Sequence, residues 1–134
     1  MFFHGSANPL SNGLKLVPQT DGYVKFADNE LEQFFESHRP EDKISRSKAV
    51  FLSDDIDLID CLGGYTDYIY SVLIDSTPSK HDLHWYTLAY AYLQEGLTEK
   101  ATECAFNYWH SIEAESQLSC CEYLTTHAFI NYEV

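Results

Sequence analysis

The sequence predicts a single α+β domain that spans residues 1–134. Runs of β-branched and aromatic residues at both ends and in the centre of the chain favour strands there. Two segments with apolar residues at helical spacing lie between the central run and the last one. Strands at both ends with helices between them are typical of the α+β class. A chain of 134 residues is also long enough to bury one hydrophobic core.

The N-terminal part of the chain predicts two short extended segments. Residues 1–4 form the first strand, and Gly5-Ser6 is expected to end it. Residues 14–17, which precede Pro18, are expected to form either a second short strand or a turn.

One helix and a polar segment are expected next. Asp28 can cap a helix over residues 29–37, in which acids stand early and apolar side chains form one stripe. Residues 38–48 are polar and irregular. They contain four of the eight basic residues of the chain, here called the basic segment: Arg39, Lys43, Arg46 and Lys48.

The centre of the chain predicts a strand, a helix and another strand. Residues 49–52 are a short apolar run, and Ser53 both ends it and can cap the helix. Acids that the helix dipole favours follow in the first turn: Asp54, Asp55 and Asp57. Gly63-Gly64 stops this helix, and residues 68–74 form the next strand.

The last part of the chain predicts a helical hairpin that covers a sheet, followed by one strand. Residues 81–94 and 98–112 carry apolar side chains at helical spacing, and Gly96 separates the two helices. A polar bend leads to residues 122–132, which are expected to form a single final strand.

The composition excludes several classes of partner. A formal net charge of −13 repels the phosphates of nucleic acid and of an anionic membrane, and it favours a basic protein partner or a small substrate. The N-terminus lacks the basic and apolar regions of a secretory signal, and no run reaches the length of a membrane span. The four cysteines lack Cys-x-x-Cys spacing, so we expect reduced thiols and a cytoplasmic location.

Three segments, in this order, resemble the ADP-ribosyltransferase fold. Phe3-His4-Gly5-Ser6 is similar to the His-Gly-Thr/Ser strand of the diphtheria-toxin-like and poly(ADP-ribose) polymerase branch. Val50-Phe51-Leu52-Ser53 resembles the Val-Tyr-Leu-Thr segment of the rifamycin ADP-ribosyltransferases. Glu122-Tyr123-Leu124 is similar to the Glu-Tyr-Ile/Val strand that carries the catalytic glutamate of the family. The resemblance implies a split β-sheet with flanking helices.

The sequence departs from the family at two points. Phe51 stands where the family usually has tyrosine, so the ring is kept and the hydroxyl is lost. Glu113-Ala114-Glu115 has the Glu-x-Glu form of the arginine-type branch, which makes Glu115 an alternative catalytic acid. That branch expects an arginine where this chain has His4, so Glu122 is preferred.

The resemblance implies that NAD is the substrate and is cleaved between nicotinamide and ribose. It assigns Glu122 to the ribose 2′-hydroxyl, where a carboxylate stabilises charge that develops in the transition state. It assigns another ribose hydroxyl to His4, because imidazole can donate or accept a hydrogen bond. It assigns the nicotinamide amide to the backbone of Gly5, whose missing Cβ permits close approach.

Further residues are expected around the NAD. Ser6 follows Gly5 in the same segment, Ser53 is the small residue beside the nicotinamide, and Phe51 offers its ring to the cationic nicotinamide. Tyr65 is a second stacking candidate by its position. The phosphates need positive charge, which Arg39 and the rest of the basic segment are expected to supply.

Several functions stay open. The leading hypothesis is a small, stand-alone mono-ADP-ribosyltransferase that modifies a protein or small-molecule acceptor, for example an effector or an inhibitor in a phage–host interaction. The acidic composition favours an acceptor with a basic surface. The same site would give an NAD glycohydrolase if water were the acceptor. A different class is a non-catalytic acidic protein that mimics nucleic acid.

Each candidate residue also has a structural interpretation. Phe51 in a short strand can be core, the basic segment can be a solvated loop, and Glu122 is ordinary if its side of the strand faces solvent. His81-x-x-His84 has the helical spacing of a metal pair, but no third ligand is evident, so no metal site is expected.

Overall fold

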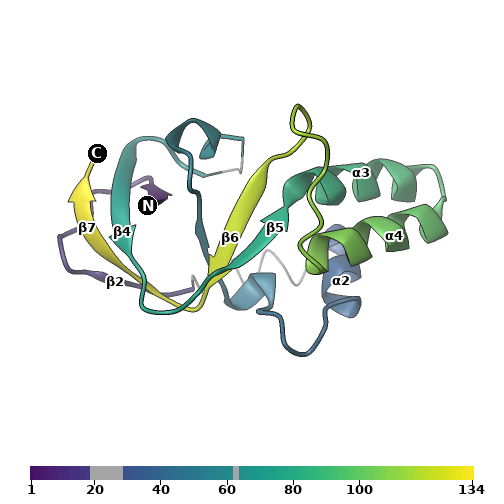
Figure 1. Ribbon diagram of the computed structural model, residues 1–134, viewed down its shortest axis with the longest axis horizontal. Helices are drawn as coiled ribbons and strands as arrows, with labels where there is room; N and C mark the ends of the chain where they lie inside the picture. Colours follow the sequence, from purple (N-terminus) through teal and green to yellow (C-terminus); the bar gives the residue numbers. More distant parts are fainter. Residues whose placement is uncertain (19–28, 62–63) are drawn as a thin grey trace.

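The computed structural model describes residues 1–18, 29–61 and 64–134, and it confirms the α+β class (Figure 1). The expected cap Asp28 and the glycine at position 63 lie outside the described residues. The described elements, in chain order, are β1 (Phe2–Ser6), β2 (Lys15–Leu16), α2 (Glu30–Ser37), the 3₁₀ turn η1 (Arg46–Lys48), β3 (Val50–Leu52), the 3₁₀ turn η2 (Ile56–Leu58), β4 (Tyr68–Leu73), β5 (Ser79–Asp82), α3 (Leu83–Gln94), α4 (Thr98–Trp109), β6 (Cys121–Thr125) and β7 (Ala128–Glu133).

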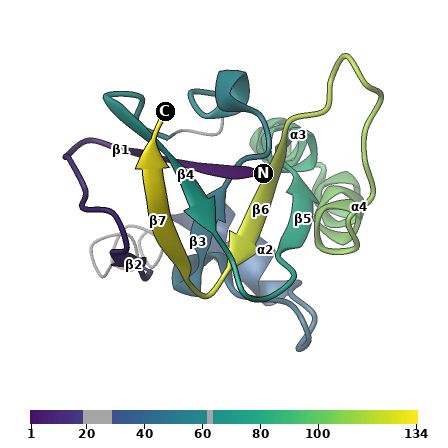
Figure 2. The ribbon, with the colours of Figure 1, turned by 60° about the vertical axis from the view of Figure 1, so that its left-hand side comes forward.

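The strands form two antiparallel sheets. One sheet has the order β1-β4-β7-β2 and the other has the order β3-β6-β5. Figure 2 shows β4 and β7 side by side in the first sheet, and β6 and β5 side by side in the second. An isolated bridge joins the sheets, in which Phe3 and Ser53 exchange backbone hydrogen bonds of 2.7 and 3.0 Å. The bridge is isolated, so β1 and β3 belong to different sheets.

Two apolar clusters stabilise this arrangement. The first lies between the sheets and takes side chains from both of them: Leu16, Val50, Leu52, Tyr70, Val72, Ala128 and Ile130. The second joins α2 to the hairpin of α3 and α4, which lies beside the three-stranded sheet in Figure 1. In this second cluster the indole of Trp109 donates a 2.8 Å hydrogen bond to the carbonyl of Phe35 at the end of α2.

The helices that the sequence predicts from local signals are present. Asn29 caps α2 by accepting a 3.1 Å hydrogen bond from the backbone N–H of Glu32. Gly96 separates α3 from α4 with φ +75°, a conformation that glycine adopts cheaply. The predicted helical hairpin is therefore confirmed, although α4 ends at Trp109 rather than at residue 112.

The expected helix after Ser53 is wrong, because only the 3₁₀ turn η2 forms among the described residues of this segment. The hydroxyl of Ser53 accepts from the N–H of Asp55 and donates to its carbonyl, so it closes a local turn. Such a turn offers the backbone an alternative to a helix. Asp55 instead caps η2 through the N–H of Asp57.

Two further strand assignments differ from the prediction. Gly5 and Ser6 do not end β1, because they stay paired with Ile69 and Tyr68 of β4. His81 lies in β5 rather than in a helix, so the spacing to His84 is not that of one helical face.

The expected single strand over residues 122–132 is in fact two strands in different sheets. The chain turns at Thr126-His127, and the hydroxyl of Thr125 donates a 3.2 Å hydrogen bond to the carbonyl of His127. The turn places β6 between β3 and β5, and it places β7 between β4 and β2.

Candidate functional site

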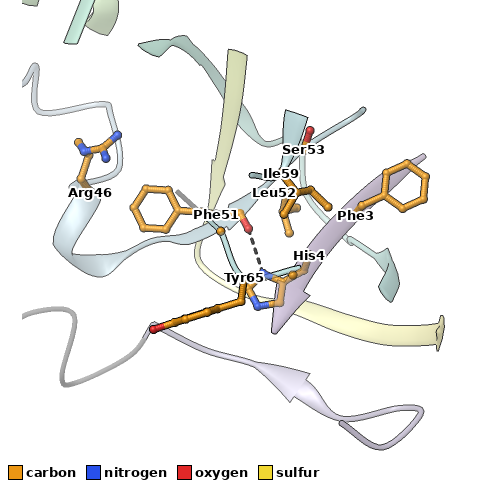
Figure 3. A pocket seen from close by; sticks show the side chains of 10 residues that line it. Phe3, His4, Arg46, Phe51, Leu52, Ser53, Ile59 and Tyr65 are labelled. Carbon is orange, nitrogen blue, oxygen red and sulfur yellow. Dashed lines mark hydrogen bonds between the residues drawn. The ribbon is translucent and has the colours of Figure 1, made fainter. Parts of the chain in front are cut away.

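A pocket of about 300 Å³ is lined by residues of both β1 and β3, next to the bridge between Phe3 and Ser53 (Figure 3). The described residues that line it come from β1, from η1, from β3 with the residue after it, and from the β3–β4 connection: Phe3, His4, Gly5, Arg46, Phe51, Leu52, Ser53, Ile59, Gly64 and Tyr65. Six of the residues that the sequence analysis singled out therefore meet in one place: His4, Gly5, Arg46, Phe51, Ser53 and Tyr65.

His4 links the two strands that form the pocket. Its Nδ1 lies 3.0 Å from the carbonyl oxygen of Phe51, and because a carbonyl only accepts, Nδ1 carries the proton. Burial lowers the pKa of His4 below its usual value, which favours the neutral ring at pH 7. Because the proton of the neutral ring is on Nδ1, Nε2 is unprotonated and can accept a hydrogen bond.

Gly5 has a structural role that the sequence did not predict. A Cβ at this position would lie 1.9 Å from the carbonyl oxygen of Tyr65 and 2.9 Å from Cγ2 of Ile59. The missing side chain therefore makes room for the β3–β4 connection. The side chain of Tyr65 itself is exposed at the pocket.

Ser6 and Arg39, which were both expected to bind NAD, do not line the pocket. The hydroxyl of Ser6 donates to the carbonyl of Asn8 and accepts from its N–H, which closes a turn at the end of β1. Arg39 forms an ion pair with Glu36 and donates to the carbonyl of Lys43. Of the basic segment, Arg46 is the member that lines the pocket.

Phe51 already contacts a cation of the protein. The guanidinium carbon of Arg46 lies 5.1 Å from the centre of the Phe51 ring, and Figure 3 shows the two side chains next to each other. The same guanidinium lies 4.8 Å from the ring of Tyr86 and 5.6 Å from the ring of Tyr108. The Phe51 ring therefore already has a cation–π contact within the protein, of the kind that the family resemblance implied for nicotinamide.

Glu122 is buried directly behind Arg46. Its side chain is 2% exposed, and its carboxylate forms an ion pair with Arg46 and accepts a 2.7 Å hydrogen bond from the hydroxyl of Tyr108. Burial raises the pKa of Glu122, and the attraction of Arg46 and the hydrogen bond from Tyr108 oppose this increase. Glu122 does not line the pocket, whereas Arg46 contacts both the carboxylate and the pocket.

Arg46 forms a second ion pair, with the carboxylate of Glu32. The Nε of Arg46 lies 3.0 Å from Glu32, whose other oxygen accepts a 2.7 Å hydrogen bond from the hydroxyl of Tyr86. The sequence analysis did not identify Glu32, Tyr86 or Tyr108. One feature of the sequence could have pointed to the partner of Glu122. A carboxylate that is buried in an apolar strand needs a cation beside it, and the chain has few basic residues to choose from.

The alternative acids lie away from the pocket. Glu113 forms an ion pair with Lys80, and Glu115 accepts a 3.1 Å hydrogen bond from the side chain of Gln117 on the exposed bend before β6. Neither lines the pocket that contains His4.

In comparisons with known proteins, no family model, no curated protein and no solved structure matched this chain. Within residues 1–18, 29–61 and 64–134, no helix has the length and apolar character needed to cross a membrane. In the same residues, no three His, Cys, Asp or Glu side chains are grouped to hold a metal ion.

Proposed function

We propose that this chain is a small mono-ADP-ribosyltransferase that uses NAD and modifies an acceptor with a basic surface. The observation that carries the proposal is the convergence of His4 and Phe51 on one pocket, with Glu122 one side chain behind it. The division of the strands into two sheets joined at Phe3 and Ser53 supports an ADP-ribosyltransferase-like split sheet. The four free thiols favour a cytoplasmic location.

The pocket suits the nicotinamide end of NAD rather than the whole dinucleotide. A volume of about 300 Å³ is at the small end of ligand pockets, so the adenosine would lie outside it. The Nε2 of His4 would accept a hydrogen bond from a ribose hydroxyl. Gly5 lies two residues after Phe3, so its N–H and C=O point to the strand edge that Phe3 uses to pair with Ser53. That edge would pair with the carboxamide.

The reaction follows from these positions. The bond between ribose C1′ and the nicotinamide nitrogen breaks, and its electron pair leaves with neutral nicotinamide. The ribose develops positive charge, which a carboxylate hydrogen-bonded to the 2′-hydroxyl stabilises in the transition state. A nucleophile of the acceptor forms the new bond to C1′ and releases its proton to water. Glu122 is the carboxylate assigned to this role.

The experiment incubates the protein with NAD labelled in the adenosine half, together with a cell lysate. The proposal expects label on an acceptor protein and released nicotinamide with the wild type, and neither with Glu122→Gln. Glu115→Gln is the matched control and should behave like the wild type, because Glu115 lies on the exposed bend. Free labelled ADP-ribose without labelled protein would identify a glycohydrolase. Equal labelling by the wild type and Glu122→Gln would refute the role of Glu122.

A non-catalytic acidic binding protein is the second candidate, and one observation favours it. The β3–β4 connection has exposed acids without the helix that would explain them locally: Asp54, Asp55, Asp57, Asp60 and Asp67. If these acids bind a basic protein, neutralising Asp57, Asp60 and Asp67 together should abolish its capture from a lysate. Glu122→Gln should not affect such a capture.

A further inference from the structure

Arg46 separates the pocket from the carboxylates behind it. The guanidinium is held among three aromatic rings, and its side chain is 11% exposed. On its inner side it forms ion pairs with Glu32 and Glu122, and it also lines the pocket. A reaction that uses Glu122 on a ligand in the pocket therefore requires Arg46 to give way.

The contacts of Arg46 are divided between its nitrogen atoms. Its Nε lies 3.2 and 3.0 Å from the two oxygens of Glu32. Its Nη1 contacts Glu122 and lies 2.6 Å from the hydroxyl oxygen of Tyr108. Because different nitrogens serve the two carboxylates, the contact with Glu122 can be exchanged while the contact with Glu32 is kept. The ion pair with Glu32 would then still compensate the positive charge of Arg46 while Arg46 leaves Glu122.

An anion in the pocket would compete for this guanidinium. Among the described residues that line the pocket, Arg46 carries the formal positive charge, and the low pKa of His4 keeps that ring neutral at pH 7. The described lining contains no carboxylate. Arginine binds phosphate groups strongly, since its planar donors match two oxygens at once. The diphosphate of a nucleotide is therefore the ligand group for which Arg46 would leave Glu122.

We propose that Arg46 is a ligand-operated latch, which masks Glu122 until a phosphate or diphosphate group in the pocket draws the guanidinium away. This inference rests on the proposed function, in which Glu122 acts on the ribose of NAD. It makes Arg46 a positioning residue, because its contact decides when the carboxylate can reach the substrate. Binding of the diphosphate and exposure of Glu122 are then one event.

The test measures the affinity for inorganic pyrophosphate by isothermal titration calorimetry. In Glu122→Gln the competing charge is gone, while the amide oxygen still accepts from Tyr108 and Arg46. We expect this variant to bind pyrophosphate about tenfold more tightly than the wild type, because the anion no longer displaces a charge-assisted contact. Arg46→Gln should bind at least about tenfold more weakly, because it lacks the cation. Lys100→Gln removes an exposed charge of α4 outside the pocket and should leave the affinity unchanged.

Unchanged or weaker binding by Glu122→Gln would overturn the latch, as would binding by Arg46→Gln at the wild-type affinity. Absence of binding by both the wild type and Glu122→Gln would overturn it too. If Arg46→Gln does not fold, the comparison of Glu122→Gln with the wild type decides alone.

Pyrophosphate has no glycosidic bond, so its binding is independent of the proposed reaction. Tighter binding by Glu122→Gln, without any nicotinamide release by the wild type in the presence of a lysate that contains acceptors, would refute the enzymatic proposal and support the latch. Nicotinamide release without this change in affinity would refute the latch and leave the enzyme.

Discussion

Gly5→Ala is the substitution that the geometry of the pocket constrains most strongly. The new Cβ would lie 1.9 Å from the carbonyl oxygen of Tyr65, whereas Cβ atoms essentially never come within 3.0 Å of another heavy atom, so the two must separate by about 1.1 Å. The obstacle is backbone, which cannot rotate away as a side chain can. Overpacking usually costs about 1–3 kcal/mol, and we expect a loss near the upper end, about 3 kcal/mol, in the free energy of unfolding.

Urea denaturation followed by circular dichroism measures this loss. Gly13→Ala is the matched control, because nothing lies within 4 Å of its Cβ position and its φ of +82° adds only the strain of a left-handed residue, about 1 kcal/mol. A loss below about 1 kcal/mol for Gly5→Ala would show that the connection before β4 does not pack on β1 as described.

Three further predictions concern the buried network and the pocket. Tyr108→Phe removes a hydroxyl that donates to Glu122 and accepts from Arg46, and should cost about 1–3 kcal/mol in urea denaturation, whereas Tyr90→Phe on the exposed side of α3 should cost nothing measurable. Burial lowers the pKa of His81 to about 4 in the folded protein, whereas His81 in the unfolded chain is protonated below about pH 6.5. Acid therefore favours the unfolded chain, and the free energy of unfolding should fall by about 3 kcal/mol as the pH drops from 6.5 to 4. His81→Gln should remove most of this pH dependence, and an unchanged dependence would assign it to other groups. Phe51→Ala should weaken NAD binding in calorimetry by loosening Arg46 and widening the pocket, and an unchanged affinity would exclude Phe51 from the site.

Elements with strong local signals were predictable from the sequence. Gly96 and the apolar spacing on either side of it specify α3 and α4, because the glycine conformation and the helical stripe are properties of short segments. The break at Thr126-His127 was not predictable. Neither residue is a strong turn former. The chain passes from one sheet to the other at this point because β6 pairs with β3 and β5, whereas β7 pairs with β4 and β2.

The candidate site was predictable only in part, for a related reason. The family resemblance grouped His4, Phe51 and Glu122 around one ligand, whereas the structure brings His4 and Phe51 to one pocket and buries Glu122 behind Arg46. The ion pair between Arg46 and Glu122 joins residues 76 positions apart, and no local pattern specifies such a contact. It changes the chemistry of the site, because it buries the expected catalytic acid behind the cation that was expected to meet a phosphate.

The most direct test of the account is proton NMR detection of nicotinamide released from NAD, by the wild type and by Glu122→Gln side by side. Urea denaturation of both proteins, run in parallel, shows whether the substitution has cost stability. The account predicts release by the wild type and loss of nearly all of it in a Glu122→Gln variant that remains folded. Release at the same rate by both proteins, or by neither in the presence of a lysate that contains acceptors, would contradict it.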